Sequence, residues 1–353
     1  MKKTSNNGDG VTIVDVANLA GVSIATVSRV INGYSRILPR TRKRVQRAIE
    51  QLSYHPNVHA RRLVTQSVDT ICYLLCNRSF LNRFHAGILT GVERAASSLQ
   101  HEVLYTTFSY SPETPAAELD LPPILQRAGA VGGVILAGTN YPNLLQAVRE
   151  RRIPFIVFAN NLVQKGRPKY PLEGVFYDDG SPSYEITQRL IEMGHKRIAF
   201  VGDLTQPWWL RRRTAFRQAL KEHHLRPIEY SEPLTSAVEY GEEAVTRLMA
   251  ASRKPTAIFA GNDLIAFGVW RQCRKMGISI PGDVSLIGFD DMAEATLMDP
   301  TLTTVHVPVE EVGQECVRMI VEKMHKPDVV LPERLIGTHV VSRESWGPAP
   351  GER

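Results

Sequence analysis

The most regular pattern near the N-terminus is Thr12-Ile-Val-Asp-Val-Ala-Asn-Leu-Ala-Gly-Val-Ser-Ile-Ala-Thr-Val-Ser-Arg-Val-Ile-Asn32. Its apolar residues recur at helical spacing on both sides of an Ala-Gly-Val turn, and a residue able to cap a helix, Thr12 or Ser23, precedes each half. The pattern predicts two short helices joined by a turn, with Val27 and Val30 packed inward. Such a helix-turn-helix places the start of its second helix in the major groove of DNA.

Positive charge is concentrated in the same part of the chain. Residues 1–67 contain eleven Lys and Arg against three acidic residues, a net charge of +8, whereas the whole chain carries +6, which leaves −2 for residues 68–353. A module that neutralises DNA phosphates requires such an excess, and a slightly negative body has no reason to touch a polyanion. The alternative is a solvated basic tail, but the regular apolar pattern between the basic residues argues against it.

Two further segments complete the predicted head. Arg40–Leu52 has apolar residues at helical spacing behind Pro39, a residue that suits a helix start. Tyr54–Leu63 then indicates a basic helix that is too short to be stable alone in water. DNA could order this segment, and Leu63 could act as a wedge between base steps in the minor groove.

Beyond residue 68 the chain alternates apolar, β-rich runs with amphipathic helical stretches. This order predicts parallel sheets covered by helices on both faces, and the length favours two similar lobes over one. The expected strands are Thr70–Leu75, Val131–Leu136, Phe155–Phe158, Arg197–Val201, Ala257–Ala260 and Val284–Gly288, and the expected helices include Gly87–Leu99, Ser183–Met193 and Leu264–Met276. Ligands of such sheets bind beyond the carboxyl ends of the strands, so we expect a site in the cleft between the lobes.

Motifs along nearly the whole chain carry a family resemblance. They are Val14-Asp-Val-Ala, Ala20-Gly-Val-Ser, Thr26-Val-Ser-Arg-Val-Ile-Asn32, the hinge from Pro56-Asn57 to Leu63, Gly194-His-Lys-Arg-Ile-Ala-Phe200, Gly261-Asn-Asp263, Asp283-Val-Ser-Leu-Ile-Gly-Phe-Asp-Asp291 and Pro300-Thr-Leu-Thr-Thr-Val305. In this order and at these distances the chain resembles the lactose and galactose repressor (LacI/GalR) family of bacterial transcription regulators. The resemblance implies a small all-α helix-turn-helix head and an α/β two-lobed body with parallel sheets, like that of periplasmic sugar-binding proteins.

The resemblance also implies that the chain crosses between the lobes three times. We expect crossings near Ala159–Leu162, Asp290–Ala293 and Leu302–Val305. The predicted parts are a helix-turn-helix domain at 1–53, a hinge helix and linker at 54–67, a two-lobed effector-binding and dimerisation domain at 68–345, and a tail at 346–353. Within the body, the N-lobe would span about 68–160 and 291–303, and the C-lobe about 161–290 and 304–345.

Helix-turn-helix geometry and the resemblance together assign the DNA contacts to Thr12, Ser23, Ile24, Ala25, Thr26, Ser28, Arg29, Asn32, Asn57, Ala60, Arg61 and Leu63. Ile24 and Ala25 stand where some relatives carry longer polar side chains. Because short apolar groups can contact only the thymine methyl, we expect thymine at one or two half-site positions, while Arg29 keeps the capacity for a guanine contact. A two-fold dimer should pair two heads on a palindromic operator. The tail has no heptad pattern, so a dimer is expected rather than a tetramer.

The resemblance places the effector site at Phe84, Asn160, Trp209, Arg212, Asn262 and Asp290. Asn262 and Asp290 match family positions that hydrogen-bond ligand hydroxyls, but both precede helical segments and could instead be helix caps. Arg212 matches an arginine that reaches the ligand, with arginines on either side that leave the register open by one. Trp208 and Trp209 could offer an aromatic face to a sugar ring or simply pack the domain.

Two departures from the family leave the class of effector open. Asn160 stands at the first predicted crossing, where relatives often have an acid. The loop 77–85 is longer than expected and carries two arginines. These arginines are either solvated or suited to a phosphorylated or acidic effector.

The predicted function is a ligand-responsive, DNA-binding transcription regulator. It is most simply a repressor whose affinity for a double-stranded operator changes when a sugar or sugar derivative binds. Neither the identity of the effector nor the sign of its action follows from the sequence. A metabolite-binding protein with a vestigial head is the alternative, and the complete hinge argues against it.

Other functions lack their motifs. No Gly-x-Ser-x-Gly elbow, phosphate-binding loop or His-Glu-x-x-His pair occurs, so no enzyme is predicted. His55 and His59 lack a third ligand, and we expect neither a metal nor a cofactor. The four cysteines lie at apolar positions, as buried thiols do in a reducing compartment. With no signal peptide and no membrane-length apolar run, the expected location is the bacterial cytoplasm, in association with the nucleoid.

Overall fold

The computed structural model of the chain describes residues 11–31, 37–54, 68–78, 82–163, 170–233 and 236–351. The chain divides into two compact units, Met1–Val68 and Asp69–Arg353. Each unit has its own hydrophobic core. Within the described ranges no single helix is long and apolar enough to cross a membrane, although Ile13–Ala20 and Ile24–Ile31 taken together reach the required length and composition across a bend of 104°.

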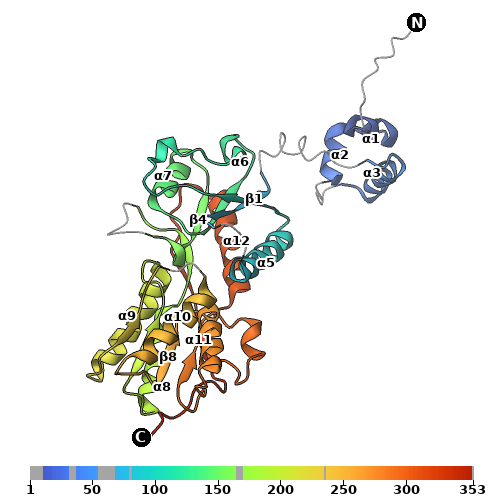
Figure 1. Cartoon of the computed structure of the whole chain (residues 1–353). Helices are drawn as coiled ribbons and strands as arrows, with labels where there is room; N and C mark the ends of the chain where they lie inside the picture. The colour runs from blue at the N-terminus through green and yellow to red at the C-terminus, as the bar shows by residue number, and fades with distance from the viewer. Residues whose placement is uncertain are drawn as a thin grey trace. The chain divides into compact units, whose positions relative to one another are not determined.

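The described residues of the first unit form three helices, α1 (Ile13–Ala20), α2 (Ile24–Ile31) and α3 (Pro39–Gln51) (Figure 1). The predicted N-caps of the first two are present. The Asp15 backbone N–H donates to Thr12 Oγ1 at 3.4 Å, and the Thr26 N–H donates to Ser23 Oγ at 3.2 Å. Gly21 ends α1 with a φ of +59°, a left-handed conformation that glycine adopts at little cost. The buried core of this unit is Val16, Ala17, Ala20, Val27, Val30, Val45, Ala48 and Tyr54.

In the second unit, the first lobe is built on a parallel sheet with strand order β11-β5-β4-β3-β1-β2. Its strands are β1 (Thr70–Cys76), β2 (Glu102–Phe108), β3 (Gly133–Gly138), β4 (Phe155–Phe158), β5 (Gly174–Tyr177) and β11 (Arg334–Ile336). Its helices are α5 (Arg83–Ser98), α6 (Pro123–Gln126), α7 (Pro142–Glu150) and α12 (Val309–His325), with the short helices η1 (Ala116–Glu118) and η2 (Ala159–Asn161).

The apolar run of β1 shows why this sheet is buried on both faces. Successive strand residues point to opposite faces, so Ile71 and Tyr73 pack in the cluster that contains residues of α5 and α12. Cys72 and Leu74 pack in the cluster that contains residues of α6 and α7. All seven residues of β1 are buried, as expected for a central strand of a parallel sheet.

The second lobe is built on a smaller parallel sheet with strand order β7-β6-β8-β9. Its strands are β6 (Ile198–Val201), β7 (Ile228–Tyr230), β8 (Ala257–Ala260) and β9 (Ser285–Ile287). Its helices are α8 (Gly180–Glu192), α9 (Pro207–Glu222), α10 (Ala237–Ala250), α11 (Asp263–Lys275) and η3 (Ala293–Thr296). Helix α8 packs on α9, and α10 packs on α11. In Figure 1 this lobe is the lower, mainly yellow and orange one.

The lobe boundaries predicted from the sequence are wrong at two of the three crossings. Strand β5 pairs with β4, so the first crossing follows Tyr177 instead of lying near Ala159–Leu162. Residues 290–303 stay with the second lobe, where the Gly288 N–H donates to Thr303 O at 2.9 Å. Because α12 and β11 pack on the first sheet, residues 307–336 belong to the N-lobe.

The N-lobe therefore comprises about residues 69–177 and 307–336, and the C-lobe about 180–303 and 342–351. Three segments join the lobes. They are residues 178–179, β10 (Thr304–His306) and β12 (His339–Val341), of which the last two pair antiparallel. The crossing predicted at Leu302–Val305 overlaps β10. An apolar run does not reveal which sheet it will join, because strand pairing is a long-range property, and this explains the two errors.

Candidate functional site

A pocket of about 670 Å³ opens between the two lobes. Its N-lobe wall consists of Asn77, Arg78, Asn82, Phe84, His85, Thr139, Asn161 and Tyr177, and its C-lobe wall of Asp203, Gln206, Trp208, Trp209, Arg212, Ser236, Ala237, Val238, Asn262, Leu264 and Asp290. Most of these residues follow the carboxyl ends of parallel strands, where α/β sheets bind their ligands. A second hollow of about 580 Å³ lies near the amino ends of β3 and β4, away from every predicted effector residue.

Arg212 is the buried centre of the C-lobe wall. Its side chain is 1% exposed, and its Nε donates to Asp179 Oδ1 at 2.9 Å. Its Nη2 donates to the Tyr177 hydroxyl at 2.9 Å and lies 3.7 Å from Asp290 Oδ1. Burial opposes the charge, but these three neighbours outweigh it and raise the pKa of Arg212. The guanidinium is therefore fixed in place before any ligand arrives.

The arginines on either side of Arg212 have different partners. Arg211 is part-exposed and donates from Nε to Asp179 Oδ2 at 2.8 Å. Arg213 pairs with Glu229 at 2.9 Å and does not line the pocket. Of these three neighbouring arginines, Arg212 is the one that lines the pocket, as the sequence prediction placed it.

Asp290 combines strain with burial. Its φ is +116°, a conformation that is costly for a residue other than glycine and that occurs preferentially at binding sites. Burial raises its pKa to about 7, with Arg212 acting in the opposite direction. A carboxyl group poised in this way can accept from, or donate to, a ligand hydroxyl.

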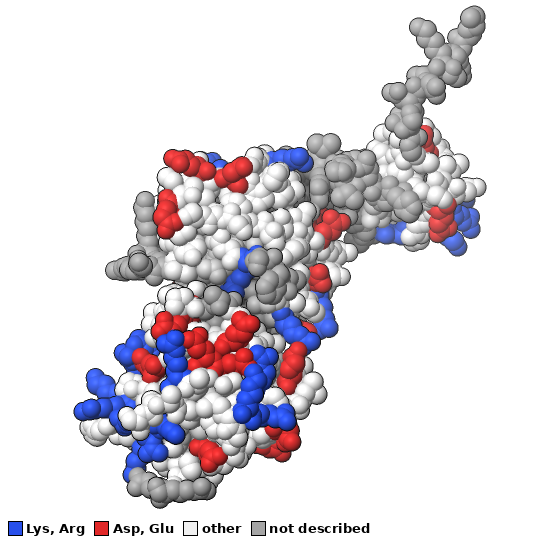
Figure 2. Space-filling model, viewed as in Figure 1, with Lys and Arg blue, Asp and Glu red and all other residues white. Residues whose placement is uncertain are grey.

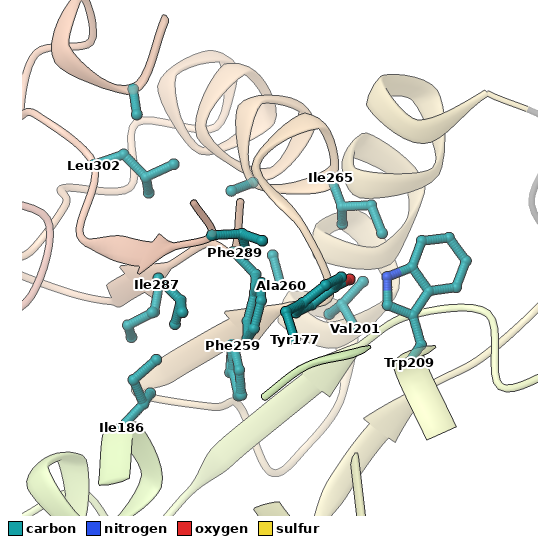
Figure 3. Close-up of a cluster of buried hydrophobic side chains, with 14 of the residues drawn as sticks. Tyr177, Ile186, Val201, Trp209, Phe259, Ala260, Ile265, Ile287, Phe289 and Leu302 are labelled. Atoms are coloured by element: carbon teal, nitrogen blue, oxygen red, sulfur yellow. The ribbon is translucent and has the colours of Figure 1, made fainter. Parts of the chain in front are cut away.

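Asn262 and Trp209 line the pocket and also have structural roles. Asn262 Oδ1 accepts from the Ile265 backbone N–H at 2.9 Å, so this residue caps α11 as the alternative interpretation held. Trp209 is almost fully buried, and its Nε1 donates to Gly261 O at 3.1 Å. Figure 3 shows the Tyr177 hydroxyl directed toward Trp209 at the edge of the buried cluster. Only part of the Trp209 surface can therefore serve a ligand.

Asn160 does not line the pocket, so the prediction that placed it in the effector site is wrong. Its side chain is buried, donates to Tyr177 O at 2.9 Å and accepts from the Tyr177 N–H at 2.8 Å. Its Nδ2 also donates to Asp179 at 2.8 Å. These bonds hold β5 and the first crossing in place. The next residue, Asn161, is the one in the pocket wall.

Asp179 is the key residue that the sequence prediction missed. It is buried, and it receives donors from Asn160, Arg211 and Arg212. The missed signal was the short apolar run that became β5. Had Gly174–Tyr177 been recognised as a strand, the acids that follow it would have been candidates for the same edge as Asp290.

A second buried carboxyl group lies beside the crossing strand β10. Asp263 Oδ1 accepts from Thr304 Oγ1 at 2.6 Å, and Oδ2 accepts from the Met292 N–H at 2.7 Å. Burial, reinforced by the nearby Asp290 charge, raises the pKa of Asp263 to about 8. This side chain therefore ties the crossing between the lobes to the wall of the pocket.

We predict that Asp263 makes stability depend on pH. In unfolded chains an Asp titrates near pH 3.9, so the folded chain holds this proton more tightly. The stability contributed by Asp263 is complete below that pH and is lost as the pH rises through about 8. The difference in melting temperature, wild type minus Asp263→Asn, should decrease as the pH is raised from 6 to 9. A difference that stays constant over this range would contradict the assignment.

The described residues of the predicted DNA-reading face are exposed or half-buried. On α2, Ile24 is 48% exposed, and Ala25 and Arg29 are also exposed, while Val27 and Val30 are buried. Thr12 and Ser23 are exposed caps, and Thr26 and Ser28 are half-buried. The predicted contacts at Asn32, Asn57, Ala60, Arg61 and Leu63, and the pair His55 and His59, lie outside the described residues. Helix α3 also carries exposed basic residues, namely Arg40, Lys43, Arg44 and Arg47.

Within the described ranges, no group of three or more His, Cys, Asp or Glu side chains is arranged to hold a metal ion. Cys72, Cys76, Cys273 and Cys316 are buried free thiols. Burial raises the pKa of Cys72 and of Cys273 to about 12, which leaves both uncharged and unreactive near neutral pH.

Comparison with protein families gives two matches. Residues 12–57 match the model described as bacterial regulatory proteins, lacI family, and residues 187–346 match the periplasmic binding protein-like domain. The HTH-type transcriptional regulator DegA of Bacillus subtilis (strain 168) is 33% identical over 339 residues, which cover 94% of this chain and 98% of that protein.

Two solved structures are similar over almost the whole chain. The lac repressor dimer bound to operator and the anti-inducer ONPF has a TM-score of 0.80 at 24% identity, and the match covers 96% of this chain and 99% of that chain. The complex of the transcriptional regulator CelR with cellobiose has a TM-score of 0.67 at 28% identity. The match covers 95% of this chain and 99% of that chain. The fold of the chain, a helix-turn-helix head followed by a two-lobed body, is thus a known one.

Proposed function

Because the chain belongs to the lacI family of bacterial regulatory proteins, we propose that its inter-lobe pocket binds the small molecule that controls its affinity for DNA. The protein is a ligand-responsive, DNA-binding transcription regulator and not an enzyme. The observation that carries the proposal is the buried Arg212, which is held by Asp179 and Asp290 in the wall of a pocket formed by both lobes. The proposal includes no cofactor.

A sugar or sugar derivative fits the chemistry of the C-lobe wall. Asn262, Asp290 and Arg212 offer donors and acceptors for hydroxyl groups, and Phe84 and Trp208 offer apolar faces. The solved CelR structure holds cellobiose, and its chain is similar to this one over nearly its whole length.

The segments that join the lobes, β10 and β12 among them, could transmit effector binding to the DNA-binding head. His306 of β10 is 2.9 Å from Asp291, which also pairs with Arg343 at 2.6 Å just beyond β12. A ligand that touches both lobes favours one arrangement of these joints, and that arrangement would set the position of the segment that leads to the head. By linkage, DNA must change effector affinity by the same factor.

On DNA we propose a two-fold dimer that reads a palindrome with the predicted head and hinge residues, and that acts most simply as a cytoplasmic repressor. The solved lac repressor on its operator is a dimer. One helix-turn-helix contacts only a few base pairs, so pairing two heads is the simplest route to specific binding.

Within this proposal, Leu63→Ala should weaken specific operator binding and leave effector binding unchanged. A minor-groove wedge contributes on the order of a few kcal/mol, and the loss should appear in the Kd for operator and not in the Kd for random duplex. Leu38→Ala is the matched control, because Leu38 is 74% exposed in the head and is not a predicted contact. Unchanged operator affinity in Leu63→Ala would refute the wedge role.

The test of the proposed function is a pair of titrations on the full chain. Compounds that stabilise the protein thermally are added to operator complexes, and the operator Kd is measured with wild type, Asp290→Asn and the exposed-site control Asp328→Asn. The proposal predicts that binding of the compound and its effect on operator affinity are both lost in Asp290→Asn alone. A compound that binds in the pocket without changing operator affinity would contradict it.

A further inference from the structure

The two walls of the pocket differ in charge. Among the N-lobe lining residues that the structure describes, none is acidic, and Arg78 carries the one full positive charge. The lining acids, Asp203 and Asp290, both belong to the C-lobe, and Asp290 already has a basic neighbour in Arg212. On the face shown in Figure 2, acidic side chains gather on the C-lobe where it meets the N-lobe. An asymmetric ligand would fit such a pocket better than a uniformly neutral one.

Arg78 follows the end of β1, and hydrogen bonds of its neighbour hold the backbone there in place. The preceding residue, Asn77, donates from Nδ2 to Thr139 O at 3.2 Å and accepts from the Tyr110 N–H at 2.9 Å. The Arg78 guanidinium carbon lies 5.2 Å from the centre of the Trp208 ring, so the side chain reaches from the N-lobe to a residue of the C-lobe.

The charge of Arg78 has no acidic partner among the residues that the structure describes. Its Nε is shut off from solvent and has no hydrogen-bond acceptor there either. A partly buried cation is costly when it lacks a carboxylate partner and one of its N–H groups has no acceptor, and a bound anion would reduce that cost.

His85 supplies a second unused donor in the same wall. Burial, reinforced by the nearby Arg78, lowers the pKa of His85 to about 3, so the ring is neutral. Its Nε2 lies 3.5 Å from Asn161 Nδ2, an arrangement in which the amide donates and the ring proton sits on Nδ1. That Nδ1 is buried without a partner in the described chain. Because His85 lines the pocket, we expect a ligand oxygen there to accept from this N–H.

The helix that carries His85 also favours a negative charge at this place. Helix α5 is 16 residues long and begins at Arg83, and Asn82 and Phe84 beside its start line the pocket. Asn82 Oδ1 already accepts from the His85 backbone N–H at 2.9 Å, but the other N–H groups of the first turn lack intrahelical partners and lie at the positive end of the helix dipole.

We propose that Arg78, His85 and the start of α5 form a subsite for an anionic group, a phosphate or a carboxylate. The effector would then be a phosphorylated or acidic sugar derivative, with its hydroxyl groups toward Asn262 and Asp290. This inference rests on the proposed role of the pocket as the effector site.

The test compares matched ligands on the full chain at constant ionic strength. The probes are glucose, fructose and ribose, the corresponding sugar phosphates, glucuronate and galacturonate, and inorganic phosphate, each followed by thermal shift and by tryptophan fluorescence. We expect at least one anionic probe to bind at least tenfold more tightly than its neutral counterpart. The phosphates and uronates distinguish the two anion types.

Substitutions locate the anion. Arg78→Gln should lower the affinity for the anionic probe by roughly 10- to 100-fold, and Arg78→Lys should recover part of that affinity. Arg94→Gln is the matched control, because Arg94 lies on α5, is exposed and pairs with Glu310 away from the pocket. The inference is overturned if only neutral sugars bind, if no probe binds, or if Arg78→Gln binds the anion as wild type does.

Operator affinity measured in parallel separates this inference from the proposed function. A neutral sugar that changes operator binding equally in wild type and Arg78→Gln would overturn the anion subsite and leave the effector site intact. An anion that needs Arg78 for binding but never changes operator affinity would support the subsite and contradict the effector role.

Discussion

Deletion of residues 1–66 should abolish specific DNA binding and leave effector affinity unchanged. The deleted segment holds the excess positive charge and all the predicted DNA contacts, whereas residues 68–353 carry a net charge of −2. We expect duplex affinity to fall by at least about 10³-fold, the usual gap between specific and weak electrostatic binding. Fluorescence anisotropy with a labelled operator measures this loss.

The structure supports the second half of that prediction. Val68 ends one compact unit, and the body has its own buried core and the complete pocket. Calorimetric titration of the truncated protein should give the effector Kd of the full chain measured without DNA. Duplex binding retained by the truncated body would contradict the division of labour between head and body.

Arg212→Ala should abolish the effector response while operator binding without effector persists. Arg212 joins Asp179, Tyr177 and Asp290 at the place where both lobes meet the pocket. The substitution removes the guanidinium N–H groups that would donate to the ligand, and it leaves Asp290 without its basic neighbour. Operator titrations with and without effector should therefore coincide for this variant.

The same substitution should also destabilise the body. Breaking a buried ion pair costs about 3–5 kcal/mol, although Asp179 keeps Arg211 and Asn160 as partners. The titrations should therefore be made at a temperature where circular dichroism shows the variant folded. Arg213→Ala is the matched control, because it removes the same charge one residue along α9 but pairs with Glu229 away from the pocket. A normal effector response in Arg212→Ala would place the site elsewhere.

The head could be predicted from the sequence because its determinants are local. Thr12 and Asp15 cap a helix three residues apart, and Val27 and Val30 lie on one face of the next helix. Six strands of the body, β1, β3, β4, β6, β8 and β9, could be predicted for a similar reason, since each lies in a largely continuous apolar run. The sequence prediction missed β2, whose residues alternate between half-buried and exposed at a sheet edge, and it missed several strands of only three or four residues.

The errors in the site come from long-range pairing. Placing the first crossing before β5 put Asn160 in the pocket and hid Asp179, which lies just beyond that strand. Because β5 pairs with β4, the Asn160 side chain has a structural role: it donates a hydrogen bond to Tyr177 O. No local pattern distinguishes Asn160 from Asn161, because the short helix η2, which follows β4, decides which side chain faces the cavity.

The most direct test of the central claim is selection of bound duplexes from a randomised pool by the full chain at moderate salt, repeated with neutral and anionic sugars. We predict an enriched palindrome of roughly 16–20 base pairs, with thymine opposite Ile24 and Ala25, that one compound releases or tightens. Salt-sensitive binding with no enriched sequence, unchanged by every compound, would contradict the assignment of this chain as a ligand-responsive operator-binding regulator.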